Sequence, residues 1–209
     1  MGRPIMENLW QQTKHQNLID ISSNVLNKEI DVDVTVVGGG FSGLSTAYHL
    51  AQQGANVAVL EAVDVGEGAS GRNVGLANAG LWIMPKQAEQ LLGGRQGQQL
   101  NQLLIDAPVY VKALIDRYNI DCDFNSNGTL HLAHSKSSVE QLLERQRQLR
   151  AYGADIDFLA ATTVYEKTQA KGYNGALLDH RAGALHPLKY CQGLARIAQN
   201  CGAKIYTQS

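Results

Sequence analysis

The segment that most limits how this chain can fold runs from Asp31 to Glu61 and reads DVDVTVVGGGFSGLSTAYHLAQQGANVAVLE. Apolar residues alternate over positions 32–37 and stop at glycine, which predicts a buried parallel strand that ends in a turn. A helical apolar period follows, and Gly54 ends it. The buried face of that helix is expected to hold Leu44, Ala47, Tyr48 and Ala51. The apolar run 57–60 then predicts a second strand, so the segment indicates a βαβ unit of a Rossmann-like α/β domain.

The glycine turn has the pattern Gly-x-Gly-x-x-Gly, formed by Gly38, Gly40 and Gly43. The first glycine permits the tight turn, the second leaves room for a pyrophosphate, and the third lets the helix pack close to the strand. Free N–H groups and the peptide dipoles at the helix N-terminus favour phosphate. Glu61 ends the second strand about 20 residues later, where its carboxylate can accept hydrogen bonds from a ribose. The pattern predicts a dinucleotide site, and the alternative is an ordinary βαβ unit that binds no nucleotide.

The stretch after Glu61 is unusually rich in glycine and reads AVDVGEGASGRNVGLANAG. Small residues allow a ligand to approach the backbone closely and leave several N–H donors unencumbered. A flexible surface loop is the alternative. The position of this stretch directly after the acid expected to bind the ribose favours contact with the ligand over that alternative.

Composition and charge exclude several functions. The 209 residues carry a formal net charge of −1, which provides no electrostatic footprint for nucleic acid. Cys122, Cys191 and Cys201 form no C-x-x-C pair and no zinc spacing, so free thiols in a reducing compartment are expected. No apolar run approaches the roughly 18 residues of a membrane span, and the first residues lack the apolar core of a secretory signal. A cytoplasmic protein without a membrane segment is therefore predicted.

The later sequence predicts further elements. Residues 98–118 keep a helical apolar period, and Pro108 within it is expected to kink or split the helix. A strand is predicted at 129–133, and the pair Ser137 and Glu140 is interpreted as a capping box that begins the next helix. Gly153 ends that helix. Further predicted elements are a strand at 156–159, a short helix at 162–168, a helix at 187–200 and a strand at 203–207.

The histidines do not predict a metal site. His131 and His134 are three residues apart, which places them on opposite faces of a strand. His180 and His186 flank an AGAL sequence that is interpreted as a turn, where packing is favoured over a substrate contact. No catalytic side chain can be named from the sequence.

Two motifs together, VVGGGFSGLSTAYHLAQQGANVAVLEA and GEGASGRNVG, resemble the FAD-dependent amine and amino-acid oxidoreductases of the D-amino-acid oxidase superfamily. Within it, the chain resembles gamma-glutamylputrescine oxidase-like enzymes in particular. The downstream stretches RYNIDCDF, GTLHLAH and YNGALLDHRAGALHPLKY resemble segments of those enzymes in the same order, so the resemblance runs from about Trp10 to the last residue. Those oxidases usually have Gly-Gly after Arg-Asn, whereas this chain has Val74 and Gly75. The β-branched side chain of Val74 is expected to narrow the flavin site or to alter the choice of substrate.

The resemblance implies FAD as the cofactor. It implies that the pyrophosphate is surrounded by Gly38, Gly40, Phe41, Ser42 and Gly43, and that Glu61 binds the adenosine ribose. The family loop that approaches the pyrophosphate and the flavin ring corresponds to Ser70, Gly71, Arg72, Asn73, Gly75 and Leu76. Arg72 is expected to pair with phosphate, the alternative being an exposed surface arginine.

The implied function is FAD-dependent oxidation of a primary or secondary amine, or of an amino acid, at its C–N bond to an imine. Oxygen or another acceptor then reoxidises the flavin. The expected architecture is α/β, a Rossmann-like FAD/NAD(P)-binding domain with an inserted, incomplete α+β substrate domain. The segments are 1–30 as an N-terminal arm, 31–120 as the FAD-binding core with its following helices, 121–185 as part of the substrate domain, and 186–209 as the return to the FAD-binding domain. The chain is expected to be the N-terminal part of a longer oxidase.

Two other functions stay open at this point. An NAD-dependent dehydrogenase would share residues 38–61 but would not need the small-residue loop 66–75. A non-catalytic nucleotide-binding remnant would keep the glycine turn without turnover.

Overall fold

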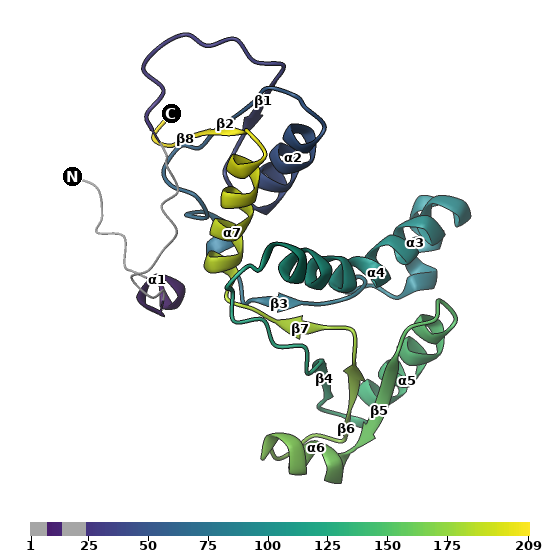
Figure 1. Ribbon diagram of the computed structural model, residues 1–209. Coiled ribbons are helices and arrows are strands. Elements are labelled where there is room, and N and C mark those ends of the chain that lie inside the picture. The colour runs from purple at the N-terminus through teal and green to yellow at the C-terminus, as the bar shows by residue number, and fades with distance from the viewer. Residues whose placement is uncertain (1–7, 14–23) are drawn as a thin grey trace, which may run out of the picture. The chain divides into compact units, whose positions relative to one another are not determined.

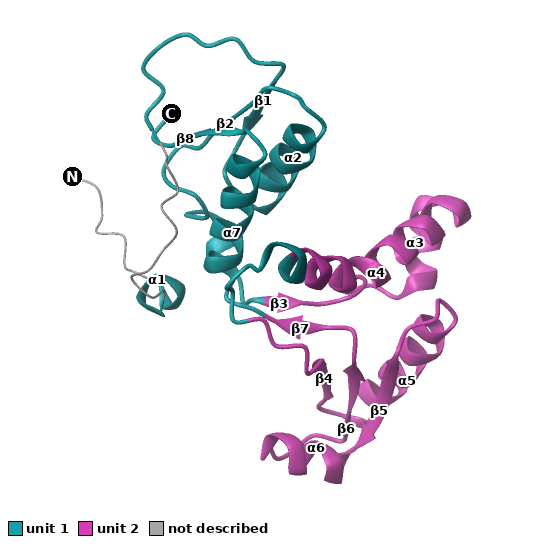
Figure 2. Ribbon diagram, in the orientation of Figure 1, with its two compact units in different colours: residues 1–75, 115–123, 185–209 teal, residues 76–114, 124–184 magenta. Residues whose placement is uncertain are grey.

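The computed structural model describes residues 8–13 and 24–209 of the chain (Figure 1). Helices and sheets alternate in an α/β arrangement, as predicted. The chain divides into two compact units, coloured separately in Figure 2. The first contains residues 1–75, 115–123 and 185–209, and the second contains 76–114 and 124–184. The chain therefore leaves the first unit and returns to it twice.

The first unit is built on a three-stranded parallel sheet in the order β1-β2-β8. Its strands are β1 (Val34–Val37), β2 (Val57–Leu60) and β8 (Lys204–Tyr206). Val59 lies at the centre, in register with Val36 on one side and Ile205 on the other. All three side chains are buried, as expected for β-branched residues in a parallel sheet covered by helices.

Helices α2 (Phe41–Gln52) and α7 (Pro187–Asn200) pack against each other and against this sheet. The predicted buried face of α2 is confirmed, because its buried residues are Leu44, Ala47, Tyr48 and Ala51. The Tyr48 hydroxyl is 2.7 Å from that of Tyr118. Pro187 occupies the first turn of α7, where the lack of an N–H has no cost.

The described residues of the N-terminal segment include a short helix, α1 (Leu9–Thr13). The expectation of an arm over residues 1–30 lies partly outside the described residues, which omit 1–7 and 14–23. Asn24 forms a parallel bridge to Tyr206, so the described part of this segment reaches the edge of the parallel sheet.

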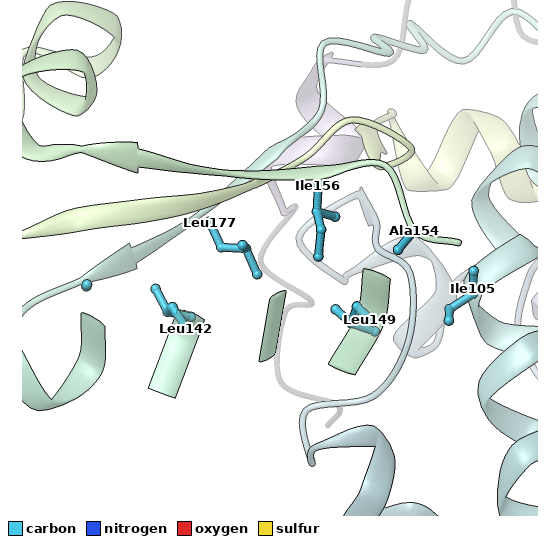
Figure 3. Packing of buried hydrophobic residues seen from close by; sticks show 7 residues of the cluster. Ile105, Leu142, Leu149, Ala154, Ile156 and Leu177 are labelled. Carbon is cyan, nitrogen blue, oxygen red and sulfur yellow. The ribbon is translucent and has the colours of Figure 1, made fainter. Parts of the chain in front are cut away.

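The second unit contains a three-stranded antiparallel sheet in the order β4-β6-β5. Its strands are β4 (Thr129–Ala133), β5 (Ile156–Ala160) and β6 (Gly175–Asp179). Helix α5 (Lys136–Arg150) packs on one face, and α6 (Ala161–Thr168) follows β5. The core beneath α5, shown in Figure 3, consists of Ile105, Ala133, Leu142, Leu149, Ala154, Ile156 and Leu177. The central strand β6 was not predicted from the sequence.

Helix α3 (Pro85–Leu92) precedes α4 (Gly94–Tyr118). Pro108 was expected to kink or split α4, and the structure contradicts the split. Pro108 lies inside α4, yet the helix is not split. A proline lacks the N–H that would bond to the carbonyl four residues earlier, here that of Leu104. The backbone N–H of Gly80 donates to that carbonyl at 3.1 Å. The Leu104 carbonyl therefore accepts a hydrogen bond from the loop that contains Gly80, in place of the one that Pro108 cannot donate.

The predicted capping box of α5 is wrong. Ser135 is the N-cap, with an extended backbone, and its hydroxyl accepts a hydrogen bond from the N–H of Ser138 at 3.1 Å. The helix therefore begins two residues before the expected cap at Ser137, and Glu140 lies too far inside the helix to complete a box. Three neighbouring serines offered alternative caps, and the earliest one is used.

The AGAL sequence is not a turn. Its residues Gly183–Ala184 form β7, which pairs antiparallel with β3 (Leu76–Ala77). Ala184 also exchanges two backbone hydrogen bonds with Asn125. A Cβ added at Gly183 would lie 2.5 Å from the Asn125 carbonyl oxygen, so the close approach of backbones requires glycine. No helix in the described part of the chain is both long and apolar enough to cross a membrane.

Candidate functional site

The glycine turn between β1 and α2 is shaped by close backbone contacts. Gly38 has a φ of +103°, which favours glycine, and its N–H donates to the Leu60 carbonyl at 2.8 Å. A Cβ added at Gly43 would lie 2.0 Å from the Gly38 carbonyl oxygen. That distance leaves no room for any side chain, so α2 starts directly against the turn. The space beside Gly38 is open, with no heavy atom within 4 Å of a Cβ built there.

The N-terminus of α2 presents unpaired backbone donors to this open space. The N–H groups of Gly40, Ser42 and Gly43 have no acceptor among the described residues. The N–H of Phe41 donates to the Ser70 hydroxyl at 3.0 Å. Unpaired donors and the dipole of a 12-residue helix favour an anion at this position. The arrangement fits the pyrophosphate of a dinucleotide.

Glu61 faces the glycine turn. Its Oε2 accepts a hydrogen bond from the N–H of Gly39 at 2.6 Å, and its Oε1 accepts one from Val63 at 3.0 Å. A carboxylate has about four acceptor positions, so two remain for a ligand. Glu61 directly follows β2, and the glycine turn directly follows β1. Because the two strands are parallel, the carboxylate and the N–H groups of the turn meet at the carboxyl ends of the strands.

The glycine-rich loop after Glu61 lies against both the turn and α7. A Cβ at Gly71 would be 2.1 Å from the Gly66 carbonyl oxygen, and one at Gly75 would be 2.2 Å from that of Leu185. The short 3₁₀ helix η1 (Ala69–Gly71) carries Ser70 to the start of α2. The loop is therefore a packed segment, with small residues where backbones touch.

Two side chains of this loop have partners within it. Asn73 donates to the Ser70 carbonyl at 2.8 Å and accepts from the N–H of Gly75 at 2.8 Å. Arg72 forms an ion pair with Glu67 at 2.7 Å and is half exposed. Its expected contact with phosphate stays a prediction, and a phosphate there would have to share the guanidinium with Glu67.

Among the other residues predicted for the flavin loop, Gly71 and Gly75 are buried and Leu76 is exposed. Leu76 lies in β3 of the second unit with 49% of its surface exposed, and Val74 is 76% exposed. The apolar side chains of Val74 and Leu76 are thus presented to solvent.

Cys191 lies beneath the site. Its thiol is fully buried on α7, with its sulfur 3.6 Å from the Gly39 carbonyl oxygen. The pKa of the Cys191 thiol is raised to about 12, mainly because the thiol is buried and to a lesser extent because of the negative charge of Glu61. All three cysteines are free, and only Cys201 is partly exposed.

Thiol alkylation tests this placement. At pH 8, iodoacetamide should modify Cys201 and leave Cys191 unmodified, because the thiolate is the nucleophile and a raised pKa removes it. Peptide mass mapping of the folded and the denatured chain gives the two patterns. Modification of Cys191 in the folded chain as fast as that of Cys201 would contradict the buried position.

The histidines have separate environments. The His186 side chain is 4% exposed, and its Nδ1 accepts from the N–H of Lys189 at the start of α7. Burial and the Lys189 charge lower the pKa of His186, which keeps the imidazole neutral and able to accept. His180 pairs with Asp157 at 3.0 Å. No three metal-ligating side chains gather among residues 8–13 and 24–209.

A pocket in the second unit lies between β4, β6, α5 and the loop 76–82. His131 lines it and stands edge-on to Trp82 at 5.7 Å between ring centroids. Arg145 fixes the loop by donating to the carbonyl groups of residues 81–83. Arg145, on the arginine-rich face of α5, therefore packs against this loop and is not wholly solvated.

The sequence did not reveal two residues beside the candidate site. The indole N–H of Trp10 donates to the Asn73 carbonyl at 2.8 Å, and the Gln11 amide donates to Glu67 at 2.9 Å. The sequence held one signal for these contacts, because Trp10 is a large aromatic residue in a mainly polar segment and such a side chain is expected to pack against the domain.

Comparison with known proteins gives consistent matches. A family model described as FAD dependent oxidoreductase (DAO) matches residues 33–209. Gamma-glutamylputrescine oxidoreductase of Escherichia coli (strain K12) is 35% identical over 187 residues, or 89% of this chain and 44% of that protein. Glycine oxidase of Bacillus licheniformis is 31% identical over 83% of this chain and 44% of that protein.

Solved structures agree on the fold. L-alpha-glycerophosphate oxidase from Mycoplasma pneumoniae, solved with FAD bound, superposes with a TM-score of 0.68 at 21% identity, over 86% of this chain and 45% of that one. The chain spans less than half the length of the curated relatives named above.

Proposed function

Because the chain belongs to the family of FAD dependent oxidoreductases, we propose that its protein oxidises a primary or secondary amine, or an amino acid, at the C–N bond. The family expected from the sequence is confirmed, and FAD is its cofactor. The alternative of an NAD-dependent dehydrogenase is thereby set aside. The substrate class is supported by the relatives, which include a gamma-glutamylputrescine oxidoreductase and a glycine oxidase.

The observation that carries the proposal is the fit of the first unit to FAD. An open turn, unpaired N–H donors on Gly40, Ser42 and Gly43, and the free acceptor positions of Glu61 lie at one sheet edge. When bound, FAD would supply an acceptor for the hydride that leaves the carbon carrying the amine, and water would hydrolyse the resulting imine. The role of this chain's residues is to bind and orient the cofactor.

We assign the cofactor contacts as follows. The turn residues Gly38, Gly40, Phe41, Ser42 and Gly43 surround the pyrophosphate, with the unpaired backbone N–H groups of Gly40, Ser42 and Gly43 as its donors. Glu61 holds the ribose. The loop residues Ser70, Gly71, Arg72, Asn73, Gly75 and Leu76 extend the site toward the flavin ring. No side chain is assigned to proton transfer.

We further propose that the second unit is part of the substrate domain. It is inserted between segments of the first unit, and it has its own sheet and core. The sequence grouped residues 76–114 with the cofactor domain, whereas these residues cluster with the second unit.

Anaerobic flavin reduction tests the function. The purified protein, loaded with FAD, should lose its flavin absorbance when gamma-glutamylputrescine or a related amine is added, and NADH should not produce this change. Admission of oxygen should restore the absorbance if oxygen is the acceptor. Stoichiometric FAD without reduction by any amine or amino acid would favour the non-catalytic alternative and contradict the proposed oxidation.

A further inference from the structure

Helix α1 lies beside α7 in the first unit, far in sequence from the loop that it contacts (Figure 1). It has only five residues, and none of them is buried. Such a short helix is marginal in isolation, so its position depends on its contacts. Those contacts are directed at the glycine-rich loop and at the start of α7.

The contacts with the loop lie on either side of η1. The indole N–H of Trp10 donates to the Asn73 carbonyl at 2.8 Å, and the Gln11 amide donates to the Glu67 carboxylate at 2.9 Å. The same carboxylate pairs with Arg72 through its other oxygen. Helix α1 therefore holds both ends of the segment that carries Ser70.

The contact with α7 anchors α1 on its other side. The Trp10 ring lies 4.8 Å from the His186 imidazole, measured between centroids, and the Thr13 hydroxyl is 3.2 Å from His186 Nε2. His186 is buried and caps α7 through its other ring nitrogen. The anchor is therefore a buried residue at the start of a long helix of the first unit.

A continuous set of hydrogen bonds connects α1 to the glycine turn. Trp10 bonds to Asn73, whose side chain bonds to the Ser70 carbonyl at 2.8 Å. The Ser70 hydroxyl in turn accepts from the N–H of Phe41 at 3.0 Å. Movement of α1 would thus disturb the residue that orders the N-terminus of α2.

We propose that α1 is a clamp on the FAD-binding loop, with Trp10 and Gln11 as positioning residues for the cofactor. This inference rests on the proposal that FAD lies against the loop 66–75. Because the clamp orders a loop that FAD also orders, docking of α1 and binding of FAD each favour the other by the same factor.

Variants of α1 test the clamp. Trp10→Phe keeps the ring contact with His186 but removes the donor to Asn73, and Gln11→Ala removes the donor to Glu67. Each should raise the Kd for FAD by about 3- to 10-fold, the effect of one hydrogen bond, and should speed FAD release. Flavin fluorescence of the full chain measures both. Leu9→Ala, which changes a side chain on the same helix that is 61% exposed, is the matched control and should leave both values unchanged.

A second readout separates positioning from mere stability. FAD should slow hydrogen exchange of the α1 amides in the wild-type chain, and Trp10→Phe should reduce that protection. The Tm of the FAD-free chain should change little. Unchanged FAD affinity in Trp10→Phe and Gln11→Ala would overturn the clamp, provided that Gly43→Ala lowers the affinity in the same assay. Failure of Gly43→Ala to do so would instead contradict the position proposed for FAD.

Discussion

Gly43→Ala should lower the affinity for FAD by about 10- to 100-fold, the equivalent of losing two neutral hydrogen bonds. The added Cβ would lie 2.0 Å from the Gly38 carbonyl oxygen, so α2 must move away from the turn. That movement displaces the N–H groups of Gly40 and Ser42 from the phosphate. Titration of the FAD-free variant, followed by quenching of flavin fluorescence, measures the loss.

The same variant should destabilise the FAD-free chain by about 1–3 kcal/mol, the usual cost of overpacking. Gly40→Ala is a milder second variant, because its Cβ would meet only the Ser70 hydroxyl, at 2.7 Å. Gly94→Ala is the matched control, since Gly94 lies at the start of α4, outside the proposed site, with no heavy atom within 4 Å of a Cβ built there. Equal FAD affinity in Gly43→Ala and Gly94→Ala would show that the turn does not hold the cofactor.

Glu61→Gln should weaken FAD binding by about 10- to 100-fold, because hydrogen bonds to a charged acceptor are worth about 1.5–3 kcal/mol each. An amide oxygen can still accept from the N–H of Gly39, so the turn should keep its shape. The amide nitrogen cannot accept from a ribose hydroxyl. Calorimetric titration with FAD measures the change.

A pair of nucleotides makes this test specific to the ribose. The wild-type chain should bind 5′-ADP in preference to 2′,5′-ADP, because the Glu61 carboxylate repels a 2′-phosphate. Glu61→Gln should lose most of that preference. Glu166→Gln makes the same charge change at an exposed position of α6 and should alter neither affinity. An unchanged preference in Glu61→Gln would place the ribose elsewhere.

The βαβ unit and its glycine turn could be predicted because their signals are local. The apolar period of α2 and the alternation in β1 lie within a few residues, and Glu61 follows at a spacing set by one crossover. Glu61 lies opposite Gly39 because β1 and β2 pair in parallel and end side by side. These parts of the candidate site required no knowledge of distant contacts.

The parts that could not be predicted depend on distant partners. Strand β6 has the sequence GALLD, without a β-branched residue, and it is a strand because β4 and β5 pair with it on both sides. Helix α4 passes through Pro108 because the Gly80 N–H replaces the missing donor. Trp10 meets Asn73 across 63 residues of sequence. No local pattern encodes any of these contacts.

The position of FAD is tested most directly by amide chemical-shift mapping of the full chain during titration with FAD. The largest shifts should fall on the N–H groups of Gly40, Ser42 and Gly43, with a second group at Glu61 and Ser70. Gly43→Ala should remove them. Saturable FAD binding with the glycine-turn amides unshifted would contradict the account, as would the absence of any binding.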